Sequence, residues 1–166
     1  MMKFVYFDAS ALVKRYIYEL GTQQVNQIFA LIPPKRMTCS GINIGEIVSI
    51  LVRKHNDGRL NNRDFADALA EFRREVIENP DFLYLSIDNT DIEASLKYIQ
   101  QYNLNATDAV ILHTAFELYL TLRAYGHELI LITSDRRLIR AGRDLSLPCI
   151  NPEIERLKDI ETLLNE

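Results

Sequence analysis

The segment 129–135 constrains the fold of this chain more than any other stretch. Four apolar residues in a row lead into two hydroxyl side chains and then Asp135. The segment 4–8 has the same design, an apolar run that ends at Asp8. Runs that are apolar on both faces are typical of strands buried in parallel sheets, so we predict two such strands. Ligands of open α/β sheets bind beyond the carboxyl ends of the strands, which indicates a site made of carboxylates.

Strand-like runs alternate with helical periodicity along the rest of the chain. This alternation predicts a parallel α/β fold with helices on both faces of the sheet. We assign residues 1–150 to a single domain and residues 151–166 to a C-terminal tail with a weak helical pattern. The expected strands are 3–7, 36–39, 83–87, 128–132 and an edge strand at 147–150. The expected helices are one that follows Asp8, then 22–31, 41–55, 62–78, one from a Thr90–Glu93 capping box to about 102, 105 to about 125, and a short basic one after Asp135.

Composition narrows the class of protein and its setting. The formal charge of −4 comes from 23 acidic and 19 basic residues, so the chain has no global basic field for nucleic acid. Cys39 and Cys149 are too far apart in sequence for a zinc or redox motif, which is typical of a reduced cytoplasmic protein. No apolar run approaches the length of a membrane span, about 18 residues or more, so we expect no membrane segment.

Four acids are the candidate catalytic and metal-binding residues: Asp8, Glu46, Asp108 and Asp135. Each has a simpler reading. Asp8 and Asp135 could only cap the helices that follow them. Asp108 could be a first-turn acid that answers an Asn105 cap, and Glu46 could be an ordinary solvated helix residue. Taken singly, these readings stay open.

The four acids together carry more information than any one of them. Carboxylates brought within about 5 Å repel one another by roughly 3 kcal/mol per pair at an effective dielectric constant of about 20. Such a cluster requires a counter-cation, and carboxylate oxygens suit Mg²⁺ or Mn²⁺. Ser10, Thr133 and Ser134 are then candidate donors that orient the carboxylates, with helix or turn capping as the alternative.

Four motifs in order make the chain resemble the PIN-domain ribonucleases, in particular the small toxins of the VapC type. An Asp-x-Ser follows the first strand at Asp8, and a Glu lies in an apolar helix after a short strand at Glu46. An Asp-Ala opens a buried helix at Asp108, and a Thr-x-Asp follows an apolar strand at Asp135. The resemblance spans roughly residues 3–150.

The resemblance implies a three-layer α/β/α sandwich with a central, mostly parallel sheet, and a Mg²⁺- or Mn²⁺-dependent endoribonuclease. By analogy, three aspartates would ligate the metal directly or through water, with Glu46 completing the acidic pocket. Lys14, Arg136 and Arg137 would hold flanking RNA phosphates, since sequence-independent affinity comes from such contacts.

The resemblance also implies partners: an RNA substrate, a cognate antitoxin that blocks the site, and commonly a second copy in a homodimer. Two alternatives remain within the family. One is an RNA-processing nuclease outside any toxin system, and the other is a non-catalytic domain that binds RNA or protein. A non-catalytic domain would be expected to have lost acids, and this chain has all four. A phosphotransferase of the haloacid-dehalogenase type needs a second Asp where Ser10 stands.

Overall fold

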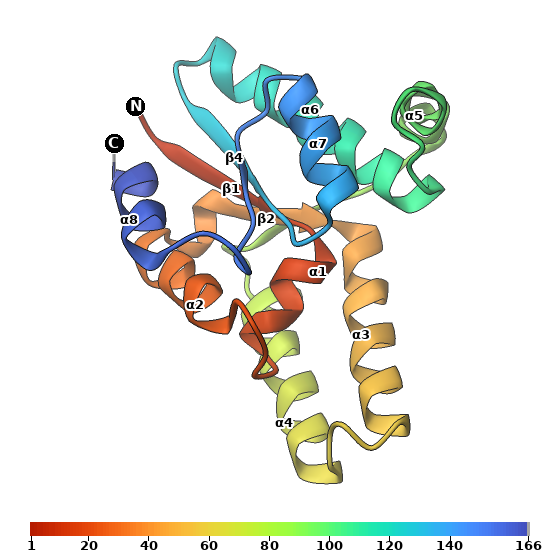
Figure 1. Cartoon of the computed structure of the whole chain (residues 1–166), viewed down its shortest axis with the longest axis vertical. Helices are drawn as coiled ribbons and strands as arrows, with labels where there is room; N and C mark the ends of the chain where they lie inside the picture. Colours follow the sequence, from red (N-terminus) through yellow and green to blue (C-terminus); the bar gives the residue numbers. More distant parts are fainter. Residues whose placement is uncertain (166) are drawn as a thin grey trace.

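The computed structural model describes residues 1–165, which are built around a five-stranded sheet in which every pairing is parallel. The strand order across the sheet is β3-β2-β1-β4-β5. Helices cover both faces of this sheet, so the prediction of a three-layer parallel α/β fold is confirmed (Figure 1). In chain order the strands are β1 (Lys3–Phe7), β2 (Met37–Ser40), β3 (Leu83–Leu85), β4 (Glu128–Ile132) and β5 (Cys149–Ile150).

The two central strands, β1 and β4, are apolar on both faces because each face supports its own core. Side chains alternate between the faces of a strand. Val5 and Phe7 therefore join one core together with Ile130 and Ile132 of β4. Tyr6 points into the other core, as do Leu129 and Leu131. Both cores exclude solvent almost completely from these strands, which fixes the strand ends firmly.

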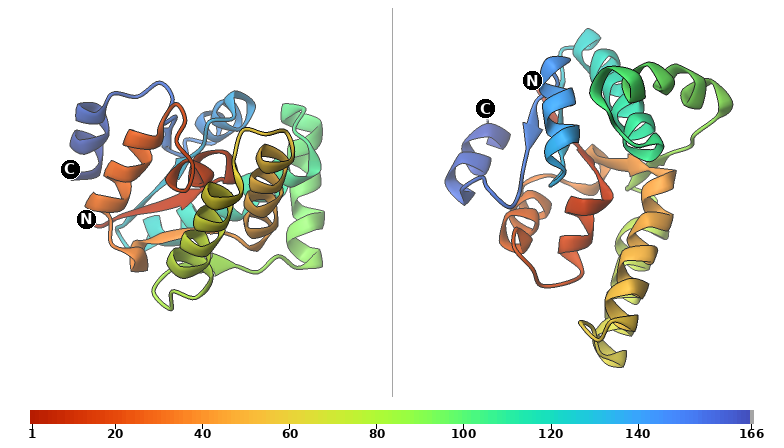
Figure 2. Two further views of the ribbon diagram at one scale, coloured as in Figure 1. Left: turned by 90° about the horizontal axis from the view of Figure 1, so that it is seen from below. Right: turned by 45° about the vertical axis from the view of Figure 1, so that its right-hand side comes forward.

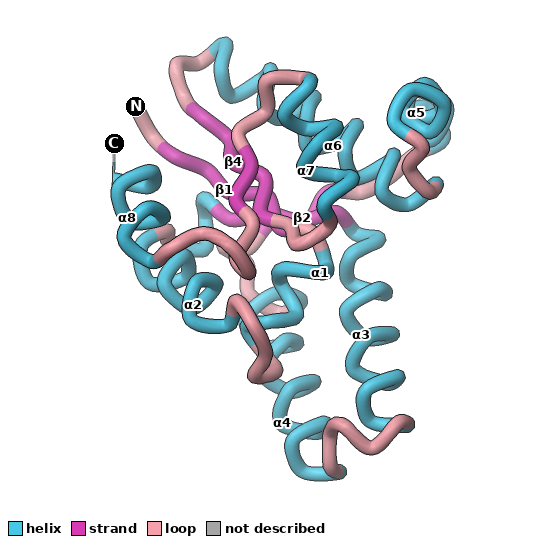
Figure 3. Tube along the Cα trace, viewed as in Figure 1, coloured by secondary structure: helices cyan, strands magenta, loops and turns pink. Residues whose placement is uncertain are grey.

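Two sets of helices cover the sheet (Figures 1 and 2). The core on the Val5 side is covered by α1 (Ala9–Leu12), α2 (Thr22–Leu31), α3 (Gly41–Asn56), α4 (Asn62–Phe72) and α8 (Leu157–Asn165). The core on the Tyr6 side is covered by α5 (Asn89–Tyr102), α6 (Ala106–Ala124) and α7 (Arg136–Asp144). Among these, α3 and α4 form a hairpin that projects away from the sheet (Figure 3).

Three local features differ from the sequence predictions. The helix after Asp8 is short, because α1 passes into the 3₁₀ helix η1 (Val13–Arg15), and a second 3₁₀ helix, η2 (Pro34–Arg36), precedes β2. The helix predicted over 62–78 ends at Phe72 and continues as the π-helix η3 (Arg73–Ile77). The prediction of a Thr90–Glu93 capping box is wrong, because α5 is capped by Asp88. The Asp88 carboxylate accepts the Asp91 N–H, and the Asp91 carboxylate accepts the Asp88 N–H.

The segment beyond residue 150 packs on the domain. Residues 157–165 form α8, which lies along α2 and buries Ile160 and Leu164 in the core on the Val5 side. The tail expected for residues 151–166 thus contributes to the same core. Within residues 1–165, no helix has the length and apolar character that crossing a membrane requires.

Candidate active site

The carboxyl ends of β1 and β4 place the candidate acids at one edge of the sheet. These strands are neighbours, with Phe7 opposite Ile132, and the Asp8 N–H donates to the Ile132 carbonyl at 2.9 Å. The chain leaves β1 for helices on the Val5 side and leaves β4 for α7 on the Tyr6 side. This divergence opens the crevice in which α/β proteins bind their ligands.

Asp8 lies at the bottom of this crevice and is 4% exposed. Its Oδ2 accepts hydrogen bonds from the Ser10 hydroxyl at 2.6 Å and from the Thr133 hydroxyl at 2.9 Å. The Ser10 N–H is 3.4 Å from the same oxygen, so Asp8 also caps α1, as the simpler reading expected. Among residues 1–165, the hydrogen-bond partner of its Oδ1 is the Asn43 amide, at 3.4 Å, so this oxygen retains capacity for a further ligand.

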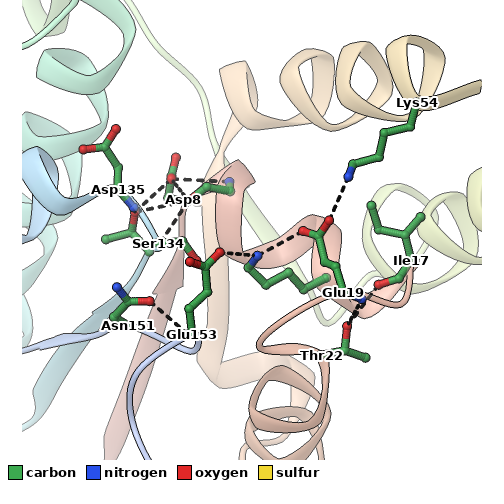
Figure 4. A network of polar contacts seen from close by, with 12 residues as sticks. Asp8, Ile17, Glu19, Thr22, Lys54, Ser134, Asp135, Asn151 and Glu153 are labelled. Atoms are coloured by element: carbon green, nitrogen blue, oxygen red, sulfur yellow. Dashed lines mark hydrogen bonds and ion pairs between the residues drawn. The ribbon is translucent and has the colours of Figure 1, made fainter. Parts of the chain in front are cut away.

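Thr133 connects Asp8 to Asp135. Its hydroxyl donates to Asp8 and accepts the Asp135 N–H at 3.1 Å. Asp135 caps α7, because its Oδ1 accepts the N–H groups of Arg137 at 2.7 Å and Leu138 at 3.1 Å. Capping occupies Oδ1 alone, so a structural role for Asp135 leaves its second oxygen for another partner. Figure 4 shows the short path from Asp8 through this loop to Asp135.

The first turns of α3 bring Glu46 to the crevice. Ser40 caps this helix and Asn43 completes a capping box, with its Oδ1 accepting the Ser40 N–H. The amide nitrogen of the same Asn43 donates to Glu46 at 3.0 Å and lies 3.4 Å from Asp8. Glu46 is half-buried rather than fully solvated. The spacing of three residues between Asn43 and Glu46 puts both on one helix face.

Asp108 enters from the opposite side, in the first turn of α6. Asn105 caps this helix by accepting the Asp108 N–H at 2.8 Å, as the sequence predicted. The Asp108 side chain is nevertheless buried, with 9% of the residue exposed. Its Oδ2 is inaccessible and has no hydrogen-bond partner among the described residues. A buried carboxylate oxygen without a partner is unusual and costly, so this atom is a candidate ligand for a cation or an acceptor for an external donor.

All four acids line one cleft of about 560 Å³. Ser10 and Asn105 border it near the acids, and the α3 face adds Ser49 and Arg53. The four predicted candidates are therefore brought together by four different elements. Within residues 1–165, no three His, Cys, Asp or Glu side chains already form a metal-holding group, so the acids share a cleft without making a closed cage.

The electrostatics of the cleft favour protonated carboxyls in the absence of a cation. Burial raises the pKa of Asp108 to about 6, and the negative charges of Asp8 and Asp135 act in the same direction. Burial also raises the pKa of Asp8, against the lowering effect of its hydrogen bonds from Ser10 and Thr133. The pKa of Glu46 is raised by burial and then by the charge of Asp8. Burial is the largest cause of all three pKa shifts, and the charges of neighbouring carboxylates add to it for Glu46 and Asp108.

The hydroxyl and basic candidates divide into those that contact the acids of the cleft and those that do not. Ser10 and Thr133 contact Asp8 as predicted. The Ser134 hydroxyl is buried and has no partner in the part of the chain that the structure describes, and the Ser134 N–H donates to the Ser10 hydroxyl at 3.0 Å. Lys14 is 4% exposed, and its ammonium donates to Glu19 at 3.0 Å and Glu153 at 2.7 Å. We therefore withdraw Lys14 as a phosphate contact, because burial and two carboxylates occupy it.

Arg136 and Arg137 remain exposed at the start of α7, close to the cleft. The positive charge of Arg137 lowers the pKa of Asp108 in opposition to the dominant effects of burial and the neighbouring carboxylates.

Sequence reasoning missed Asn43 and Arg53 as site residues. The pattern that could have indicated them is the helix face that they share with Glu46, at spacings of three and seven residues.

The residues present suit a hard divalent cation. The donor set consists of carboxylate oxygens, which Mg²⁺ and Mn²⁺ prefer. Asp108 supplies a buried oxygen without a partner, and Asp8 supplies an Oδ1 with a single long contact. A nearby cation would lower the raised pKa values of Asp8 and Asp108, because it would favour the ionised form of both groups.

Comparison with known proteins agrees with this geometry. The model of the PIN domain family matches residues 5–144, so the chain belongs to the PIN domain family. Members of this family are generally nucleases, and they typically use divalent metal ions. A search of curated proteins found no match to the sequence.

Several solved structures share the fold at low sequence identity. A crystal structure of a protein from Pyrobaculum aerophilum matches with a TM-score of 0.61 and 18% identity, covering 99% of this chain and 96% of that one. A toxin–antitoxin complex from Klebsiella pneumoniae matches with a TM-score of 0.57 and 21% identity, over 89% and 97%. FitAcB from Neisseria gonorrhoeae matches with a TM-score of 0.59 and 17% identity, over 92% and 100%. These similarities establish the fold.

Proposed function

We propose that the chain is a Mg²⁺- or Mn²⁺-dependent endoribonuclease that hydrolyses RNA phosphodiester bonds in the acidic cleft. The observation that carries the proposal is the buried, unpartnered Oδ2 of Asp108 in a cleft that also contains Asp8, Glu46 and Asp135. A fold that gathers four carboxylates in this way gains most when a cation neutralises them. Membership of a family of nucleases supports the same conclusion.

Each acid has a distinct role in this proposal. Asp8, Asp108 and Asp135 are the proposed metal ligands, directly or through water, and Glu46 completes the pocket. Ser10 and Thr133 both donate to the Oδ2 of Asp8 and hold its carboxylate in one orientation, which would leave Oδ1 for the metal. When bound, the metal ion would polarise the phosphodiester and lower the pKa of the attacking water.

The arginines near the cleft would hold the substrate. Arg53 lines the cleft from α3, while Arg136 and Arg137 start α7 next to Asp135. Guanidinium groups bind phosphate with paired, charge-assisted hydrogen bonds, and such contacts position a nucleic acid without reading its sequence.

The biological setting that we propose is a toxin–antitoxin pair in the cytoplasm. One of the structural neighbours is a toxin–antitoxin complex, which supports an antitoxin partner for this chain. Cys39 and Cys149 are free thiols, as expected for a reducing compartment. A homodimer is proposed on the family resemblance, which also favours the toxin role over a role in RNA processing.

Cleavage of a labelled single-stranded RNA tests the proposed activity. We expect the wild type to cut with Mg²⁺ or Mn²⁺ and to stop in EDTA. Asp8→Asn and Asp135→Asn should each lose more than about a hundredfold in rate, since removing even indirect support of a metal costs up to that much. Asp88→Asn is the matched control, because Asp88 caps α5 outside the cleft and Asn preserves the cap.

The control variant makes the result decisive. Loss of cleavage in all three variants, the control included, would point to a general loss of folding rather than to the loss of metal ligands. Metal-independent cleavage, or full activity of folded Asp8→Asn and Asp135→Asn, would contradict the proposed function.

A further inference from the structure

Five arginine side chains differ from the rest because they make no ion pair and no hydrogen bond with the part of the chain that the structure describes. They are Arg53, Arg136, Arg137, Arg140 and Arg143. The other arginines are held in place by carboxylates, by the Lys3 carbonyl in the case of Arg36, or by the Tyr119 hydroxyl in the case of Arg123. The free guanidinium groups are thus confined to α3 and α7.

Four of the five lie on α7, the helix that begins directly after Asp135. Arg136, Arg140 and Arg143 recur at spacings of four and three residues and so share one helix face. This row borders a groove of about 410 Å³ between α7 and the segment 151–155. The row therefore starts one residue after Asp135, which lines the acidic cleft, and it leads away from Asp135 along the helix.

The charge of α7 is opposite to that of the whole protein. Four arginines against Asp144 give the helix a net charge of +3, in a chain with a formal charge of −4. Asp144 and Glu155 also border the groove, yet neither lies within ion-pair distance of the row among residues 1–165. Unpaired guanidinium groups with this spacing are available to an external anion, and their planar fork suits phosphate.

We propose that the RNA strand leaving the acidic cleft runs along α7, with Arg140 and Arg143 binding successive phosphates in the row that Arg136 begins. The row rises by about 10 Å along the helix axis, at about 1.5 Å per residue. At about 3.4 Å per nucleotide in a stacked strand, this length matches roughly three nucleotides. The inference rests on the proposed function, and it assigns a substrate path beyond the scissile bond.

The salt dependence of RNA binding tests this path directly. A fluorescently labelled single-stranded RNA of mixed sequence is titrated with the full chain in EDTA, so that metal-dependent cleavage is absent, at several salt concentrations. The double variant Arg140→Gln/Arg143→Gln should bind the RNA more weakly than the wild type. The slope of log Kd against log salt concentration should be smaller by about 1.4, which is about 0.7 for each lost phosphate contact. Arg63→Gln/Arg74→Gln removes the same charge from exposed positions paired with Asp67 and Glu71, and should keep the wild-type slope.

Each outcome decides one question. An unchanged slope in Arg140→Gln/Arg143→Gln would overturn the path and leave the row to a partner protein. An equal loss in Arg63→Gln/Arg74→Gln would overturn it as well, because net charge alone would then explain binding. A parallel cleavage assay with Mn²⁺ separates the two proposals: a changed slope without any cleavage contradicts only the nuclease function, and cleavage with an unchanged slope contradicts only the path.

Discussion

Two groups of carboxylates near the β1–α1 junction differ in whether cationic side chains of the chain pair with them. Four carboxylates line the acidic cleft, and the buried Oδ2 of one of them, Asp108, has no hydrogen-bond partner among the described residues. In the neighbouring network, Lys14 donates to Glu19 and Glu153, and Lys54 donates to the other oxygen of Glu19 at 2.8 Å (Figure 4). The network is complete within the chain, whereas no ion pair from the described residues neutralises a carboxylate of the cleft.

The pKa values express this difference. Burial and neighbouring carboxylates raise the pKa of Asp108 to about 6. Burial also acts to raise the pKa of Glu19, but hydrogen bonds from Lys54 and Lys14 outweigh it and lower the pKa below its usual range. A structural cluster of charges therefore supplies its own counter-ions, and a cluster that does not is a candidate binding site.

The largest expected effect on stability comes from opening the complete network. Lys14→Met should lower the free energy of unfolding by about 2–3 kcal/mol, at or below the usual cost of breaking a buried pair, because Glu19 and Glu153 are partly exposed. Lys35→Met at an exposed position is the control for loss of charge. Urea unfolding measures both, and equal values for the two variants would show that the network contributes nothing specific.

The opposite change is expected in the cleft. Asp108→Asn should stabilise the metal-free protein at pH 7 by at least about 1 kcal/mol, since it removes a charge that folding makes unfavourable. Thermal or urea unfolding in EDTA measures this gain. Destabilisation by Asp108→Asn would show that the carboxylate is satisfied in the native state, which contradicts the reading of Oδ2 as a free ligand.

The two groups should respond to pH with opposite sign. In EDTA, folded Asp108 retains a proton between its ordinary pKa near 3.8 and about 6, while the unfolded chain has lost it. Stability should therefore fall as pH rises through this window. Glu19 has a lowered folded pKa, so its contribution is present above pH 4.5 and is lost as pH falls through the folded value. Urea unfolding across pH 3–7 measures both effects. In Asp108→Asn, the fall in stability between about pH 4 and pH 6 should be weaker than in the wild type.

The smallest effect distinguishes the two serines of the site. Ser10→Ala removes a 2.6 Å hydrogen bond to Asp8 and should cost about 1–2 kcal/mol, whereas Ser134→Ala removes a hydroxyl without a partner and should stay within about 0.5 kcal/mol. Equal costs would show that Ser134 supports the acids through a contact that the structure does not contain.

Local patterns were sufficient to predict the strands and to select four acids that the fold brings into one cleft. The runs at 3–7 and 128–132 are apolar on both faces because two cores share them, so periodicity and burial agree. The Asn105 cap and the α3 face that bears Glu46 follow from spacing alone. The joint presence of the acids, rather than any single one, indicated a site.

The errors arose where the sequence offers two equivalent registers or where distant segments meet. Residues 88–93 contain both Asp88-x-x-Asp91 and Thr90-x-x-Glu93, and in the structure α5 is capped by the first pair. Lys14 follows the Asp8 motif closely, yet Glu153 covers it from 139 residues away. The spacing of Phe65, Leu69, Phe72 and Val76 fits a continuous α-helix and gives no sign of the π-turn at Arg73.

The measurement that tests the central claim most directly is thermal unfolding of the wild type and Asp135→Asn with EDTA, with Mg²⁺ and with Mn²⁺. A ligand that binds only the folded state raises the midpoint, so both metal ions should raise it for the wild type, and Asp135→Asn should blunt the rise. Asp135→Asn keeps the α7 cap, so its folding should be preserved. An equal rise in the variant, or no rise in the wild type at millimolar Mn²⁺, would contradict a metal site built by these carboxylates.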